Sequence, residues 1–158
     1  MVEVGTGPGQ DAAALLAAGF DVAGVDLSPE HVRLARETGV DARLASVLDL
    51  PFANDSFPAG WTMSTLLHVA DSEFDAALTE ICRVLATGSP LAVGLWSSGD
   101  WEGPNEHDTI QPPRFFSSRS DQRVREMLAP FGTIERFATW ADRGADWHYQ
   151  WVLLRTTE

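Results

Sequence analysis

The sequence contains no lysine and a single cysteine, and it has no apolar run long enough to span a membrane. Cys82 alone excludes an intrachain disulfide and a cysteine metal cluster, so a reducing compartment is expected. The four histidines are dispersed without metal-ligand spacing, so we expect no metal. No charged leader with an apolar region precedes the first strand, and we therefore expect a soluble, cytoplasmic protein without a membrane partner.

The charge of the chain is strongly one-sided. Eleven arginines stand against 23 acidic residues, and the formal net charge at pH 7 is -12. Because the arginines are scattered, the chain would repel a phosphate backbone, and we expect no nucleic-acid partner. A length of 158 residues suffices for one domain with a core but not for a separate substrate domain, so we expect residues 1–158 to form a single domain.

The most informative motif is a strand, a glycine turn, a helix and a second strand near the amino end. Residues 2–9 read VEVGTGPG, and residues 22–26 read VAGVD. Glycine at every second position from Gly5 to Gly9 lets the backbone pass close to a ligand, and the following helix directs its first amides to the same place. Asp26, at the end of the second strand, can accept hydrogen bonds from both hydroxyls of a ribose. The motif therefore predicts a cofactor that contains a nucleoside.

Short apolar runs alternate with amphipathic segments along the rest of the chain, which predicts an α/β fold with parallel strands joined by helices. Ser72 and Asp75 have the spacing of a capping box at the start of one helix. Residues 97–113 are rich in glycine, proline and acids and are expected to be irregular. The expected helices are residues 10–18, a helix opened by Ser28 and Pro29, a helix from Ser72, and residues 121–129. The expected further strands are residues 42–45, 60–64, 91–96, 133–140 and 147–155. The last two of these strands are expected to form an antiparallel hairpin.

The chain resembles the class I S-adenosylmethionine-dependent methyltransferases over essentially its whole length. The resemblance implies S-adenosyl-L-methionine as the cofactor. It also implies a Rossmann-like, seven-stranded, mostly parallel sheet with a C-terminal antiparallel hairpin and helices on both faces. The glycine spacing, G-x-G-x-G rather than the G-x-G-x-x-G of dinucleotide folds, agrees with it. Besides VEVGTGPG, it rests on GVDLSPE at 24–30, DLPFANDSF at 49–57, LLHV at 66–69, EICRVLATGSPL at 80–91 and WHYQWVLL at 147–154.

The resemblance further implies roles for individual residues. Asp26 would hold the ribose hydroxyls, Leu27 would pack against the adenine face, and the backbone near Val47 could reach the adenine edge. Ser46 stands where the family often has an acidic residue that accepts from the adenine amino group, and a hydroxyl accepts that bond more weakly. Glu3 would orient either the glycine loop or the ammonium group of the cofactor. The loop residues that would line the methionine and ribose portion are Gly5, Thr6, Gly7 and Gly9.

On the acceptor side, His68 follows the fourth strand and is the candidate catalytic residue, as a base or an acceptor contact, because ligands of open α/β sheets bind beyond the carboxyl ends of strands. A packing or capping role is the alternative. A base is optional, since positioning an in-line nucleophile about 3 Å from the methyl group can supply much of the rate. The irregular segment is either a solvated acidic connection or an acceptor-selecting loop, with the candidates Asp100, Trp101, Glu102, Glu106 and His107, and with Arg114 as a counter-charge.

Three functions stay open on the sequence alone. The leading one is methyl transfer to a small-molecule acceptor, because residues 64–67 lack the Asn/Asp-Pro-Pro-aromatic signature of enzymes that methylate nucleic-acid amino groups. The second is a non-catalytic cofactor-binding or assembly subunit. It is motivated by Ser46 and by the start of the chain, where relatives carry helices that cover the site. Either the chain is a fragment or mis-started product, or another subunit supplies the cover, or the pocket is open. We expect an open or partner-covered pocket that binds the cofactor more weakly than in relatives, with a homodimer as one source of the cover. A nicotinamide-dependent oxidoreductase is the third.

Overall fold

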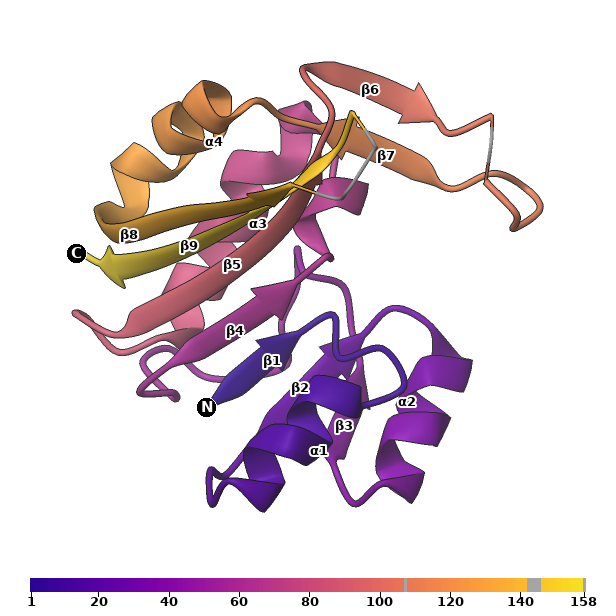
Figure 1. The fold of residues 1–158 in the computed structure, drawn as a ribbon. Coiled ribbons are helices and arrows are strands. Elements are labelled where there is room, and N and C mark those ends of the chain that lie inside the picture. The colour runs from indigo at the N-terminus through magenta and orange to yellow at the C-terminus, as the bar shows by residue number, and fades with distance from the viewer. Residues whose placement is uncertain (107, 142–145, 158) are drawn as a thin grey trace.

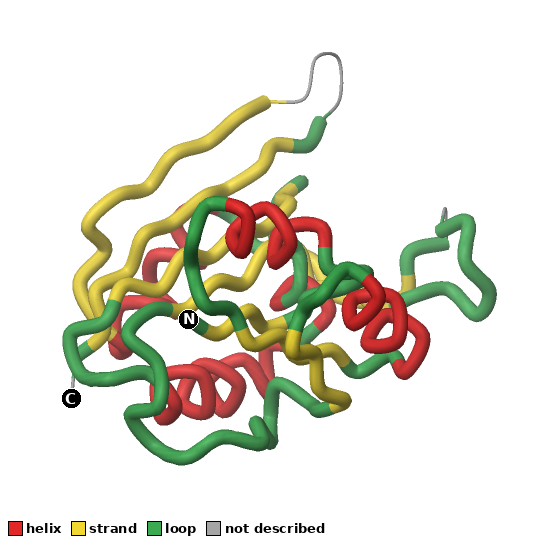
Figure 2. Tube along the Cα trace, turned by 90° about the horizontal axis from the view of Figure 1, so that it is seen from below, coloured by secondary structure: helices red, strands yellow, loops and turns green. Residues whose placement is uncertain are grey.

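The computed structural model describes residues 1–106, 108–141 and 146–157. A seven-stranded sheet carries helices on both faces (Figures 1 and 2), as predicted. The elements in chain order are β1 (Val2–Val4), α1 (Gln10–Ala17), β2 (Ala23–Asp26), α2 (Pro29–Glu37), β3 (Asp41–Leu44), β4 (Gly60–Met63), the 3-10 helix η1 (Leu66–His68), α3 (Asp71–Val84), β5 (Pro90–Ser97), β6 (Trp101–Pro104), β7 (Phe115–Ser118), α4 (Asp121–Leu128), the 3-10 helix η2 (Ala129–Phe131), β8 (Gly132–Ala141) and β9 (His148–Thr156).

The strands of the large sheet follow the order β3-β2-β1-β4-β5-β9-β8. Strands β1 to β5 run parallel, whereas β9 runs antiparallel between β5 and β8. This confirms the Rossmann-like sheet with a terminal hairpin. The chain first moves from β1 to β2 and β3 on one side and later returns to β4 and β5 on the other. In open α/β sheets, ligands bind beyond the carboxyl ends of the strands where the strand order reverses in this way.

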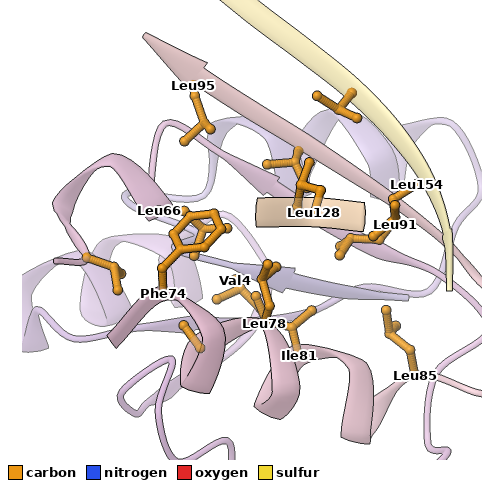
Figure 3. Close-up of a cluster of buried hydrophobic side chains, with 14 of the residues drawn as sticks. Val4, Leu66, Phe74, Leu78, Ile81, Leu85, Leu91, Leu95, Leu128 and Leu154 are labelled. Atoms are coloured by element: carbon orange, nitrogen blue, oxygen red, sulfur yellow. The ribbon is translucent and has the colours of Figure 1, made fainter. Parts of the chain in front are cut away.

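Two hydrophobic clusters hold the helices against opposite faces of the sheet (Figure 2). Helices α1 and α2 pack through Ala12, Val32 and Ala35. Helices α3 and α4 pack on the other face, where the larger cluster lies (Figure 3). Full burial of one large apolar side chain contributes about 1.5–3 kcal/mol. On α3, the buried side chains recur at the three- and four-residue spacing of one helix face: Phe74, Ala77, Leu78 and Ile81.

The start of α3 differs from the prediction. The helix begins at Asp71 with Ala70 as its N-cap residue, so the capping box expected from Ser72 and Asp75 is wrong. The Asp71 amide instead donates to the Glu102 carboxylate of β6, with 2.6 Å between N and Oε1. Any acceptor that reaches the first amides of a helix stabilises it, whether it comes from the next residues or from a distant strand.

The expectation that residues 97–113 are irregular is wrong in part. Strand β5 continues to Ser97, and β6 pairs antiparallel with β7 in a separate two-stranded sheet. This small sheet lies beyond the carboxyl end of β5, at the upper right of Figure 1. The sequence of β6, WEGP, has no alternation of apolar and polar residues. Its strand conformation depends on pairing with β7, which local sequence patterns do not reveal.

Candidate functional site

The turn between β1 and α1 brings its backbone close to neighbouring elements. Gly5, Gly7 and Gly9 have φ angles of 79°, 52° and 87°, in the region that favours glycine. A Cβ atom on Gly5 would lie 1.9 Å from Thr65 Oγ1. One on Gly9 would lie 3.0 Å from the Cα atom of Ala35 in α2, whereas one on Gly7 would meet no atom within 4 Å. The turn is therefore packed on two sides and open at Gly7.

Glu3 and Thr6 lie behind this turn. Glu3 is 3% exposed, and Thr6 Oγ1 donates to its Oε2 at 2.5 Å. Burial raises the pKa of Glu3 to about 7, because the protein interior disfavours the charged form. Neither residue lines the cavity described below. The Glu3 carboxyl group thus contacts the loop through Thr6, and its role toward the loop or the cofactor stays a prediction.

Asp26 ends β2 and connects that strand with the glycine turn. Its Oδ2 accepts from the Gly7 amide at 2.8 Å, and its Oδ1 accepts from the Ser28 amide at 2.8 Å. The Nδ1 atom of His31 lies 3.3 Å from the same Oδ1. Two backbone donors therefore hold the carboxylate in one orientation. Each carboxylate oxygen has two lone pairs, so Oδ2, which has one donor, can also accept from a ligand hydroxyl, and Oδ1 can do so when His31 Nδ1 does not donate to it.

A cavity of about 640 Å³ lies beyond the carboxyl ends of β1, β2 and β4, and its volume is typical of small-molecule and cofactor sites. Leu27 borders it with a side chain that is exposed. Ser46 Oγ, expected to meet the adenine amino group, already accepts from the Leu48 amide at 3.1 Å. Thr6 and Gly9 support the turn without lining the cavity. The predicted cofactor residues that line it are Gly5, Gly7, Asp26, Leu27, Ser46 and Val47.

His68 lines the same cavity, from the end of η1. Its Nδ1 atom is 2.8 Å from the backbone oxygen of Phe115 in β7, and its ring meets the Phe116 ring at a centroid distance of 4.6 Å. A carbonyl oxygen can only accept, so Nδ1 carries the hydrogen and Nε2 keeps a lone pair. Desolvation of the ring lowers the pKa of His68, although the residue as a whole is exposed, so the neutral ring predominates at pH 7. The imidazole can therefore accept a hydrogen bond or a proton at Nε2.

Two of the acidic residues expected to select an acceptor, Asp100 and Glu102, bind elsewhere. Asp100 accepts from the amide and the hydroxyl of Ser120 at the start of α4, at 2.6 and 3.0 Å. Glu102 accepts from the first amide of α3. His107 lies outside the described residues. The members of this group that do not line the cavity are Asp100, Trp101, Glu102 and Glu106.

Arg114 does line the cavity, but its charge is already paired. Its Nε and Nη2 donate to the two carboxylate oxygens of Asp108 at 2.8 and 3.0 Å. This pairing holds the pKa of Asp108 well below its usual range. The guanidinium also lies over the Phe116 ring, 5.2 Å from its centroid. The counter-charge expected of Arg114 is thus directed at Asp108, and the pair shapes the wall near His68.

Sequence reasoning missed the wall that follows β4. Met63, the last residue of that strand, lines the cavity together with Ser64 and Thr65, and His31 lines it from α2. Ser64 has a φ of 55°, a conformation uncommon for residues other than glycine, and its amide donates to the Gly94 oxygen at 2.8 Å. The rule that identified His68, that ligands bind beyond the ends of parallel strands, applies equally to these residues and could have found them.

The part of the chain that the structure describes contains no group of three or more histidine, cysteine, aspartate or glutamate side chains that could hold a metal ion. None of the helices described is long and apolar enough to cross a membrane.

Comparison with known proteins shows the family of the chain. A family model described as a methyltransferase domain matches residues 1–88. An O-methyltransferase of Pyrenophora dematioidea is 29% identical over 146 residues, which cover 84% of this chain and 53% of that protein. A methyltransferase of Streptomyces halstedii is 33% identical over 102 residues, which cover 59% of this chain and 36% of that protein. The chain therefore spans about half or less of the length of these curated relatives.

Solved structures show the same fold. The 1,6-didemethyltoxoflavin-N1-methyltransferase of Burkholderia thailandensis, solved with 1,6-didemethyltoxoflavin and S-adenosylhomocysteine bound, superimposes with a TM-score of 0.79 at 22% identity, covering 99% of this chain and 70% of that one. A methyltransferase of Methanosarcina mazei superimposes with a TM-score of 0.83 at 16% identity, covering 99% and 92%. The glycine turn, the Asp26 carboxylate, the sheet order and the matching family model lead to one conclusion: the chain belongs to the class I methyltransferases, whose cofactor is S-adenosyl-L-methionine.

Proposed function

We propose that this chain transfers a methyl group from S-adenosyl-L-methionine to a small-molecule acceptor, and that residues 1–158 act as a single domain. The observation that carries the proposal is that one cavity is lined by the glycine turn and Asp26 and, at another part of its wall, by His68. A donor held at the first part and an acceptor held at the second would be neighbours. Such juxtaposition is the main requirement of methyl transfer, because positioning alone can supply much of the rate.

The residues present fit the cofactor. The open space at Gly7 leaves room for a ligand against the backbone, and two amides orient the Asp26 carboxylate toward the cavity. When bound, S-adenosyl-L-methionine supplies an electrophilic methyl group on its sulfonium. Asp26 would hold the ribose hydroxyls, while Glu3 holds the turn from behind. The other assignments are Gly5, Thr6, Gly7 and Gly9 for the loop at the methionine and ribose portion, and Leu27, Ser46 and Val47 for the adenine.

On the acceptor side, His68 would accept a hydrogen bond or the departing proton of the acceptor at Nε2. Met63 and Val69 would provide apolar contacts beside it. A small acceptor is supported by the size of the cavity and by the names of the relatives, which include O-methyltransferases and an enzyme solved with 1,6-didemethyltoxoflavin. The net charge of -12 disfavours nucleic acid as the acceptor. The homodimer stays a prediction, which gel filtration would check.

Cofactor binding is tested by calorimetric titration with S-adenosyl-L-methionine and S-adenosylhomocysteine. We expect micromolar affinity for the native protein and for Asp75→Asn, a control that changes an exposed carboxylate on α3. Asp26→Asn should bind about 10- to 100-fold more weakly, because charge-assisted hydrogen bonds are worth roughly 1.5–3 kcal/mol. A folded native protein that binds neither compound would contradict the proposal.

Catalysis is tested by following conversion of S-adenosyl-L-methionine to S-adenosylhomocysteine with a panel of small phenols, amines and thiols. We expect conversion with at least one member and a large decrease in kcat for His68→Gln. Cofactor binding without conversion by any member would instead favour the non-catalytic, cofactor-binding role.

A further inference from the structure

Arg119 is the largest of the fully buried side chains, with 1% exposure. Its Nε donates to Asp71 Oδ1 at 2.8 Å. Its Nη1 donates to the Leu66 oxygen at 3.0 Å, and its Nη2 donates to the Val69 oxygen at 2.6 Å. Burial of a charged side chain is costly unless the group is both paired and hydrogen-bonded, and Arg119 meets both conditions. The elements that it joins are therefore firmly connected.

Two of these acceptors bracket His68. Leu66 opens η1 and Val69 follows it, so the guanidinium binds the carbonyls on both sides of the histidine. The turn has few hydrogen bonds of its own: the His68 amide donates to the Thr65 oxygen at 2.9 Å, and the Val69 amide donates to the Leu66 oxygen at 3.2 Å. Short 3-10 turns have poor hydrogen-bond geometry, so their orientation depends on outside contacts. Arg119 supplies those contacts here.

The same side chain is attached to the strand that faces the imidazole. Arg119 follows directly after β7, and its Nη1 also donates to the Ser117 oxygen at 3.4 Å. Ser117 Oγ donates to Asp71 Oδ1 at 3.1 Å, so the strand is held to the same carboxylate. Phe115 of β7 supplies the carbonyl that accepts from His68 Nδ1 at 2.8 Å. One buried ion pair thus connects the turn that carries His68 with the strand that selects its tautomer.

We propose that Arg119 is a positioning residue that holds His68 as the Nδ1–H tautomer, with Nε2 available to the cavity. This inference rests on the proposed function, in which Nε2 meets the methyl acceptor. Arg119 itself does not line the cavity and acts through Leu66, Val69 and β7. Without its bonds, η1 and β7 are no longer held together, the Nδ1 contact with Phe115 weakens, and the ring populates the Nε2–H tautomer. That tautomer cannot take a proton from an acceptor at Nε2.

Arg123 offers a matched control. Its Nε donates to the other oxygen of Asp71 at 3.0 Å, but its side chain is 44% exposed and it bonds neither η1 nor β7 among the described residues. Arg123→Met therefore removes a cation from the same carboxylate. Arg119→Met additionally removes the bonds to the two carbonyls around His68. A difference in the His68 tautomer between Arg119→Met and Arg123→Met therefore reports the loss of the bonds around His68. It does not report the loss of a cation beside Asp71, because both variants share that loss.

The test is long-range ¹⁵N–¹H NMR of the ¹⁵N-histidine-labelled protein at pH 8, with the His68 signals assigned from a His68→Gln spectrum. The native protein and Arg123→Met should show His68 as a single Nδ1–H tautomer. Arg119→Met should show averaged ring ¹⁵N shifts from a mixture of tautomers, with circular dichroism confirming that it is folded. An Arg119→Met spectrum like that of the native protein would overturn the proposal, as would equal loss of the tautomer in Arg123→Met.

If Arg119→Met does not fold, Arg119→Lys gives the same answer. A lysine keeps the charge but has one nitrogen, which cannot bond the carboxylate and both carbonyls at once. The NMR measurement of the tautomer needs no turnover, so it tests the positioning role of Arg119 independently of activity. Failure of the native protein to bind S-adenosyl-L-methionine would refute the proposed function and would leave this test valid. With an acceptor in hand, we expect the Arg119 variant to lose at least about tenfold in kcat at an unchanged KM for the cofactor.

Discussion

Replacement of Glu3 by glutamine should remove a pH-dependent loss of stability that the native protein shows between about pH 4.5 and pH 7. Burial raises the pKa of Glu3 from 4.5 to about 7 in the folded protein. Between these two values unfolding releases a proton, so the free energy of unfolding falls as the pH rises. This loss of stability is absent below pH 4.5, the pKa of Glu3 in the unfolded chain. It is complete above about pH 7, the pKa of Glu3 in the folded protein.

The magnitude follows from the size of the shift. About 2.5 pH units at roughly 1.4 kcal/mol each amount to about 3.5 kcal/mol for the complete titration. No reduction for solvent screening is needed, because Glu3 is 3% exposed. Glutamine has nearly the same shape and keeps one oxygen that can accept from Thr6 Oγ1, so the substitution removes the titration and keeps this hydrogen bond.

The assay is urea denaturation at pH 4.5, 5.5, 6.5 and 7.5, followed by circular dichroism. The free energy of unfolding of Glu3→Gln, relative to the native protein, should rise by about 3 kcal/mol over this range. Other groups titrate equally in both proteins and cancel in the difference. Glu126→Gln, which changes an exposed carboxylate on α4, should run parallel to the native protein. If the free energy of unfolding of Glu3→Gln also ran parallel to that of the native protein over this pH range, Glu3 would not have a raised pKa in the folded protein.

Two further substitutions test the packing around the site. Gly5→Ala places a Cβ atom 1.9 Å from Thr65 Oγ1 at a φ of 79°, so it should lower the free energy of unfolding by about 2–4 kcal/mol in thermal denaturation. Gly19→Ala shares the positive φ but has no atom nearby, so it should cost about 1 kcal/mol, and an equal effect of both would contradict the close approach. Thr62→Val should leave stability unchanged or raise it by about 1 kcal/mol in urea denaturation, because the buried Thr62 hydroxyl has no hydrogen-bond partner among the described residues. A clear loss of stability would reveal a partner for that hydroxyl.

Some of the site follows from patterns close together in the sequence. The alternation of apolar runs and helices predicts the parallel sheet, and the spacing of Gly5, Gly7 and Gly9 predicts a turn that a ligand can approach. Asp26 is found because it ends the strand after the first helix, and His68 because it follows the fourth strand. Each of these inferences needs only a few neighbouring residues, since strand ends and positive φ angles are local properties.

Other features depend on residues that are far apart in the sequence. Glu102 serves the start of α3, Asp108 pairs with Arg114 at the cavity wall, and β6 is a strand only because β7 lies beside it. Arg119 shows the limit most clearly. In the sequence it is one of eleven scattered arginines, and only folding buries it between Asp71 and the turn that carries His68. The sequence alone therefore determines the sheet and the cofactor turn, whose signals are local. The tertiary structure decides what surrounds His68, because an ion pair or tautomer depends on which distant groups the fold brings within hydrogen-bond distance.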